Sequence, residues 1–199
     1  MPTDALADLL QDIRACRQCA AALPLGPRPV LRATPTARLI VCGQAPGTRV
    51  HATGLPFNDP SGDRLRAWMG IDRDAFYDEA RVSIIPMGFC YPGRDPRGGD
   101  LPPRSECAAQ WHDRLFASLP RPKLLLPIGR YAQAYHLKDQ TRPSVTETVK
   151  AWREFAPAMI PLPHPSPRNI GWLKRNPWFE AEVIPALRAA VADALGKTL

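Results

Sequence analysis

Short apolar runs alternate with longer amphipathic segments along this chain. Four runs have the composition and length of buried strands, at 38–42, 81–87, 123–128 and 158–162. Six segments show helical spacing of apolar positions or helix-type ends, at 3–17, 61–69, 103–119, 130–137, 146–155 and 177–195. Strands that alternate with helices predict an α/β fold, namely a three-layer α/β/α sandwich with a central, mostly parallel four-stranded sheet.

Length and hydropathy predict a single domain over residues 1–199. The chain has 199 residues, of which 45% are hydrophobic, enough for a sizeable core. No apolar run approaches the roughly 18 residues that would cross a bilayer. Residues 1–11 carry Asp4 and Asp8 where a signal peptide would have a basic start. We therefore expect a cytoplasmic protein with no membrane partner, and we take it to be a monomer.

The net charge bears on possible partners, and the proline content bears on the loops. The formal net charge is +7, which favours polyanionic partners such as nucleic acid. A basic surface without a special partner explains the net charge equally well. The 24 prolines stand at the ends of apolar segments and not in one linker. This distribution predicts many rigid loops on a compact scaffold.

Two loops fall where a parallel sheet places its functional residues, beyond the carboxyl ends of strands. Gly43-Gln44-Ala45-Pro46-Gly47 follows the first strand, and His164-Pro165-Ser166-Pro167-Arg168-Asn169 follows the fourth. The second loop is stiff and polar, with a histidine between prolines. A structural turn needs turn residues but not this set of side chains, although a proline-rich turn with an incidental histidine is the simpler alternative.

These two loops resemble the uracil-DNA glycosylase superfamily. Its motifs are a Gly-Gln/Glu-x-Pro loop after the first strand and a late His-Pro-Ser loop, as in 43–47 and 164–167 here. The stretch Thr53-Gly54-Leu55-Pro56-Phe57, followed by Gly62, is similar to the iron–sulfur type called family 4. The resemblance covers most of the chain. It implies an enzyme that flips a deaminated base, above all uracil, out of DNA and hydrolyses its bond to deoxyribose to start base excision repair.

The resemblance also implies roles for individual residues. His164, neutral and donating one N–H, would stabilise the negative charge that develops on the leaving base. Gln44 or Asp59 would position the attacking water, and Asp63 is a rival that the helix dipole explains equally well. The base pocket would be formed by Gly43, Ala45, Pro46, Gly47, Phe57 and Asn58. Contacts to DNA would come from Ser166, Pro167, Arg168 and Asn169.

Four cysteines suggest a metal centre. Cys16 and Cys19 form a Cys-x-x-Cys pair, and Cys90 and Cys107 follow the second strand. In a cytosolic chain such a set favours metal over disulfides, and the spacing fits either tetrahedral zinc or a cubane cluster. The family resemblance implies a 4Fe–4S cluster, with zinc as the alternative. Cys42 lies in an apolar strand and is expected to be a small core residue.

Two features depart from the family 4 pattern. Pro86 stands where those relatives carry an asparagine that reads the uracil edge, and Asn58 is the expected substitute. Thr48-Arg49-Val50-His51 replaces an acidic stretch. Hypoxanthine or another deaminated base is therefore an alternative substrate. A non-catalytic nucleic-acid-binding protein and a small-molecule hydrolase or transferase are the other candidate functions.

Overall fold

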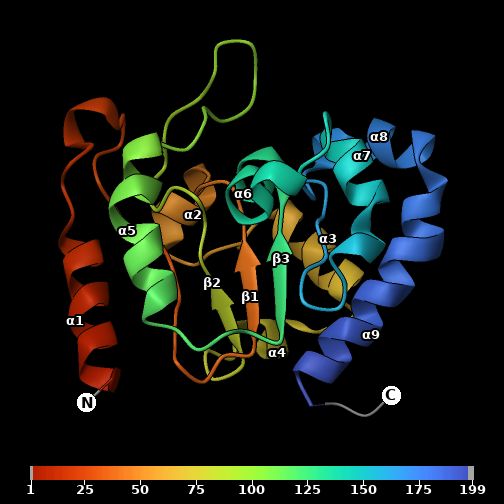
Figure 1. Cartoon of the computed structure of the whole chain (residues 1–199). Helices are drawn as coiled ribbons and strands as arrows, with labels where there is room; N and C mark the ends of the chain where they lie inside the picture. Colours follow the sequence, from red (N-terminus) through yellow and green to blue (C-terminus); the bar gives the residue numbers. More distant parts are fainter. Residues whose placement is uncertain (1, 197–199) are drawn as a thin grey trace.

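The computed structural model of the chain describes residues 2–196 and contains a parallel three-stranded sheet (Figure 1). The central strand, β1 (Leu39–Cys42), lies between β2 (Val82–Ile84) and β3 (Leu124–Pro127). Leu39 is opposite Val82 on one side and Leu124 on the other, and both pairings are parallel. All three strands are buried along their whole length, as expected for a parallel sheet that is covered on both faces.

The sheet has three strands and not the four that the sequence predicts. Residues 158–162 do run beside β3, but they form only isolated parallel bridges, Leu125 with Met159 and Ile128 with Leu162. Pro127 has no amide hydrogen to donate to this segment, so the ladder between the two segments is interrupted. The predicted position of the segment is correct, whereas its continuous strand pairing is wrong.

Helices cover both faces of the sheet, which confirms the predicted α/β/α layers (Figure 1). Ile40 and Cys42 point to a core that they share with α1 (Pro2–Ala15), α5 (Ser105–Ala117) and α6 (Gly129–Leu137). Leu39 and Val41 point to a second core with α3 (Pro60–Met69) and α9 (Ile184–Ala194). This alternation follows from the two-residue period of a strand.

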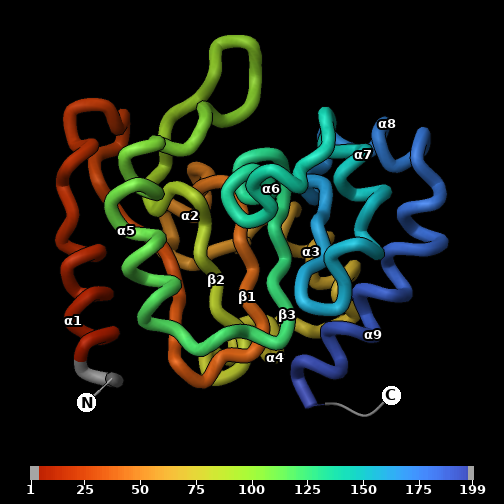
Figure 2. Tube along the Cα trace, viewed as in Figure 1, coloured from red at the N-terminus to blue at the C-terminus, as the bar shows by residue number. Residues whose placement is uncertain are grey.

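Several helical segments differ from the predicted ones, and Figure 2 shows the course of the chain through them. The predicted helix 146–155 is α7 (Val145–Lys150) followed by a separate 3-10 turn (Trp152–Glu154). The predicted helix 177–195 begins with a π-helical segment (Phe179–Val183) before α9. Short segments that the sequence analysis missed are helical: α2 (Thr48–Thr53), α4 (Arg73–Tyr77), α8 (Ile170–Arg175) and the 3-10 turns Ala20–Ala22, Lys138–Gln140 and Pro167–Asn169. Within residues 2–196, no helix is both long and apolar enough to cross a membrane.

A histidine is enclosed in the core between α5 and the sheet. The His112 side chain has no exposed surface, and its ring stacks on Phe89 with the two ring centroids 5.2 Å apart. Neither ring nitrogen has a hydrogen-bond partner among the described residues. Burial disfavours the charged ring and lowers the pKa of His112 to about 4. The folded protein therefore holds a neutral histidine at this position near pH 7.

His112 should make the fold less stable in mild acid. A histidine in the unfolded chain has a pKa of 6.5, whereas burial lowers the pKa of His112 in the folded chain to about 4. The unfolded state therefore binds more protons in this window, and the free energy of unfolding falls as the pH drops, by at most about 3 kcal/mol for this residue. His112→Phe keeps a stacked ring without the titration. We expect a flatter profile of unfolding free energy against pH, measured by urea denaturation, and equal slopes would contradict this.

Candidate functional site

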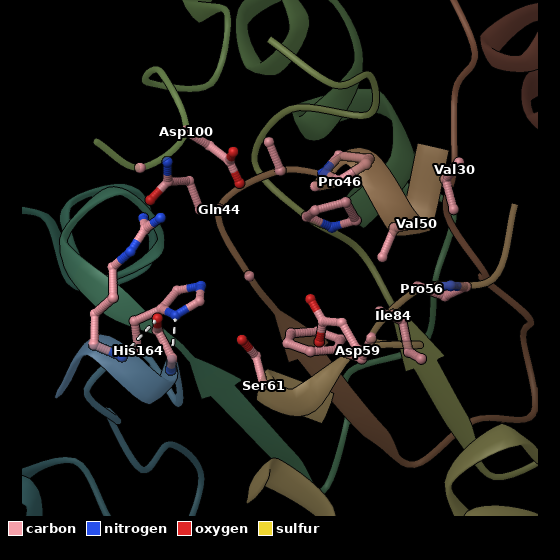
Figure 3. A pocket seen from close by; sticks show the side chains of 18 of the residues that line it. Val30, Gln44, Pro46, Val50, Pro56, Asp59, Ser61, Ile84, Asp100 and His164 are labelled. Atoms are coloured by element: carbon pink, nitrogen blue, oxygen red, sulfur yellow. Dashed lines mark hydrogen bonds between the residues drawn. The ribbon is translucent and has the colours of Figure 1, made fainter. Parts of the chain in front are cut away.

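A cavity of about 330 Å³ lies at the carboxyl edge of the sheet (Figure 3). This volume is in the range of small-molecule sites. Segments far apart in the sequence line it, because parallel strands end at the same edge. Of the predicted residues, the lining includes Gly43, Gln44, Ala45, Pro46, Gly47, Phe57, Asp59, His164, Ser166, Arg168 and Asn169.

The loop after β1 is fixed by backbone hydrogen bonds to the chain after β2. Met87 N–H donates to the Gly43 carbonyl and Gly88 N–H to the Gln44 carbonyl, both at 2.9 Å. The Gln44 side-chain amide donates to the Leu101 carbonyl at 3.1 Å. Gln44 is thus held at the cavity wall by two segments, 87–88 and the chain at Leu101, and its amide nitrogen already has a partner.

Phe57 forms part of the cavity wall with a strained backbone. Its φ is +54°, in the left-handed region that phenylalanine rarely adopts. The ring lies so close to Gly43 that a Cβ there would be 3.1 Å from Phe57 Cζ. A Cβ at Gly62 would be 1.7 Å from the Phe57 carbonyl oxygen. Phe57 can therefore hold this position only with a glycine at 62, and a side chain at 43 would crowd its ring.

The two candidate acids have different environments. Asp59 lines the cavity and caps α3, because its Oδ1 accepts a hydrogen bond from Gly62 N–H at 2.9 Å. Asp63 is outside the cavity lining and pairs with the buried Arg66, whose guanidinium also donates to the Phe57 carbonyl. The structure therefore brings Asp59 to the cavity and gives Asp63 a supporting ion pair.

His164 points into the cavity as a neutral ring with a defined tautomer (Figure 3). Ser166 N–H donates to its Nδ1 at 3.2 Å. Nδ1 is therefore the acceptor, and this hydrogen bond assigns the proton of the neutral ring to Nε2. Burial lowers the pKa of His164, and the nearby Asp59 carboxylate partly offsets this effect. The ring thus has one N–H to offer at neutral pH.

Three elements hold the histidine loop in place. The Leu162 carbonyl accepts from Gly129 N–H and from the buried Gln133 side chain, both at 2.9 Å. The Asn169 side chain donates to the His164 carbonyl at 2.7 Å. Arg64 of α3 donates to the Ser166 carbonyl at 2.8 Å. The loop is thereby fixed before, at and after the histidine.

Two predicted residues lie outside the cavity lining. The Asn58 side chain accepts a hydrogen bond from Arg73 at 3.0 Å, and Pro167 is exposed in its 3-10 turn. The sequence analysis did not single out the lining residues Val30, Val50, Pro56, Ser61, Ile84, Gly99 and Asp100, and it treated Pro86 only as a departure from the family pattern. The Ser61 hydroxyl forms no hydrogen bond within the part of the chain that the structure describes.

Asp100 is a second carboxylate at the cavity mouth, opposite Asp59 in Figure 3. Partial burial raises its pKa, Arg168 and Arg94 counteract the rise, and Asp59 adds to it. Nothing in the motif pattern indicates this residue, because it lies in a loop of 94–100 whose path brings it back to Gly47. A Cβ at Gly47 would be 3.4 Å from Asp100 Oδ2.

The four predicted metal-binding cysteines line one separate cavity. Cys16 and Cys19 lie just after the end of α1, Cys90 follows β2, and Cys107 lies in α5. Burial raises the pKa of Cys107 to about 12 and also raises that of Cys90. Among residues 2–196, no three His, Cys, Asp or Glu side chains are grouped closely enough to hold a single metal ion. Cys42 is fully buried in the core, as expected.

Fold and cavity together define an α/β protein with an enzyme-like site, in which a neutral histidine and a carboxylate face one cavity. Residues 32–188 match the family model of the uracil DNA glycosylase superfamily. Because this match covers most of the chain, the protein belongs to that superfamily. Membership implies a glycosylase that acts on DNA and takes part in DNA repair.

Proposed function

We propose that the protein removes a deaminated base, uracil foremost, from DNA by hydrolysis of the N-glycosidic bond. The observation that carries this proposal is the neutral His164, whose Nε2–H is available in a cavity that also contains the Asp59 carboxylate. An anionic leaving group needs a donor, and a cationic sugar needs a nearby negative charge and an oriented water. In the cavity, His164 supplies the donor and Asp59 supplies the negative charge.

In the proposed reaction, the C1′–N1 bond breaks and its electron pair goes to the base. His164 Nε2–H and the backbone N–H groups of the loop 43–47 stabilise the negative charge on the base. Asp59 stabilises the positive charge on the sugar. Its cap at Gly62 occupies one oxygen, and the other orients the water that attacks C1′ and accepts its proton. Gln44 is held at the wall by its bond to Leu101 and supports this loop.

The shape of the cavity supports a flipped, planar base. Phe57 offers its ring against Gly43, as a stacking surface does. Pro86 lines the cavity and has no side-chain donor, and Asn58 is turned to Arg73. The Ser61 hydroxyl, buried in the lining, is the group that we assign to the base edge in place of the absent asparagine. Ser166, Arg168 and Asn169 lie at the mouth, where the DNA backbone would pass.

We further propose that Cys16, Cys19, Cys90 and Cys107 hold a 4Fe–4S cluster. Their shared cavity, which all four cysteines line, supports this. When bound, the cluster supplies a structural cross-link between α1, α5 and the segment after β2. Its cations would favour thiolates that burial otherwise disfavours.

His164→Ala should slow base excision by about 10²–10³-fold, because it removes one donor to a developing anion. The measurement is single-turnover cleavage of oligonucleotides that contain one uracil or one hypoxanthine, followed by alkali. Binding to the same DNA should persist. Unchanged excision would reject the role of His164, and release of hypoxanthine but not uracil would change the substrate.

Asp59→Asn should reduce excision strongly while the fold keeps its stability. An asparagine oxygen still accepts from Gly62 N–H, so the helix cap survives, but the negative charge at the sugar is lost. Thermal unfolding and single-turnover excision should be measured on the same preparations. Asp63→Asn is the matched control, because Asp63 lies outside the lining. If Asp63→Asn abolishes excision and Asp59→Asn does not, the assignment moves to Asp63.

Anaerobically purified protein should contain iron and sulfide. We expect visible charge-transfer absorbance and close to four irons for each chain. Cys107→Ser should lower the iron content and the melting temperature, whereas Cys42→Ser should leave the iron content unchanged. One zinc for each chain, without iron, would replace the cluster by a zinc site.

A further inference from the structure

The loop between β2 and α5 forms a hairpin that stands away from the body of the protein (Figure 1). Arg94 and Asp100 form an antiparallel bridge at its base, and Leu101 N–H donates to the Gly93 carbonyl at 2.9 Å. At the tip, Gly98 N–H donates to the Asp95 carbonyl, also at 2.9 Å. Gly98 and Gly99 have φ near +100°, as a tight turn requires. The hairpin is thus an ordered projection.

The base of this hairpin is part of the rim of the cavity. Gly99 and Asp100 line the cavity, and the next carbonyl, that of Leu101, accepts from Gln44. A Cβ at Gly99 would be 2.9 Å from Arg168 Nη1. Arg168 of the histidine loop therefore reaches across the mouth to the hairpin. The hairpin and the histidine loop therefore both line the cavity and lie close to each other there.

The hairpin presents arginines to solvent. Arg94 is exposed, and the Arg97 side chain is 90% exposed. Asp95 accepts two hydrogen bonds at 3.2 Å from Arg97, at Nε and Nη2, so the guanidinium is held in one orientation. Its Nη1 has no partner in the described part of the chain. An oriented arginine on a narrow hairpin is suited to phosphate or to a groove, since the DNA major groove admits a two-stranded ribbon.

We propose that the hairpin 93–101 is a second DNA-contacting element. It binds the duplex beside the nucleotide in the cavity, and Arg97 at its tip makes the contact. The proposal rests on the proposed function, because the cavity is taken to hold a flipped nucleotide. The hairpin and the histidine loop then hold the DNA from opposite sides of the mouth. A DNA duplex is the favoured partner, since the exposed groups are guanidinium ions next to a site for a DNA base.

The test is binding of a duplex oligonucleotide that carries one uncleavable tetrahydrofuran abasic site, titrated at several salt concentrations. The double variant Arg94→Ala, Arg97→Ala should bind it about tenfold more weakly at physiological salt, and its salt slope should fall by about two. The matched control is Arg38→Ala, Arg121→Ala. These two exposed arginines precede β1 and β3, at the opposite edge of the sheet, and their removal should change the affinity much less.

Asp95→Asn separates an oriented contact from simple charge attraction. The asparagine keeps a side-chain oxygen that can accept from Arg97 N–H, but it loses the charge that orients the Arg97 guanidinium. It also makes the net charge of the protein more positive. We expect weaker binding to the duplex, whereas tighter binding would overturn the role of Arg97 as an oriented contact. Equal losses for the hairpin and control double variants, or none for either, would overturn the proposal.

Excision assays distinguish failure of the proposed function from failure of the hairpin proposal. If the wild type excises no base but the hairpin variants still bind duplex more weakly, the proposed function fails and the hairpin remains a DNA contact. If the wild type excises uracil and the hairpin double variant binds and excises like the wild type, only the hairpin proposal fails.

Discussion

The parallel alignment of three buried strands is the constraint on which the candidate site depends. Because β1 pairs in parallel with both neighbours, the loops after all three strands emerge at one edge. Beyond the strands, backbone groups of these loops still form hydrogen bonds to one another. Met87 and Gly88 donate to the loop after β1, and Gly129 donates to Leu162 just before His164. The cross-bonds that satisfy the backbone also hold the cavity walls in place.

The strands could be predicted from the sequence, but the interrupted pairing beside β3 could not. Hydrophobic runs located the three strands, because burial on both faces leaves a continuous apolar signal. The same signal cannot show whether a neighbouring segment can hydrogen-bond along its whole length. The segment 158–162 is as apolar as a strand, but Pro127 opposite it removes one donor from the ladder between them. Short helices such as α2 were missed since six residues carry too little periodicity.

Residues of the candidate site could be predicted where a local sequence motif defines them. They could not be predicted where the tertiary path of the chain brings them to the cavity. The loop 43–47, Phe57 and His164 lie in stiff motifs, and the structure brings them together. Asn58 is one residue from the cavity lining on either side, but its rotamer is set by Arg73. Asp100 reaches the mouth only because a hairpin folds back on itself. Tertiary contacts of this kind leave no periodic trace in the sequence.

The segment 86–90 connects the two cavities of the protein. Pro86 lines the candidate site, while Gly88, Phe89 and Cys90 line the cysteine cavity. Between them, Met87 and Gly88 bond to the loop after β1. This segment has no regular secondary structure, and hydrogen bonds along it fix its position. Val30 N–H donates to the Phe89 carbonyl at 2.7 Å, and Phe89 N–H donates to Cys107 Sγ at 3.3 Å. The proposed cluster at Cys90 and Cys107 would add to these bonds. A metal centre that touches no substrate would in this way help to hold the wall formed by Gly43 and Gln44.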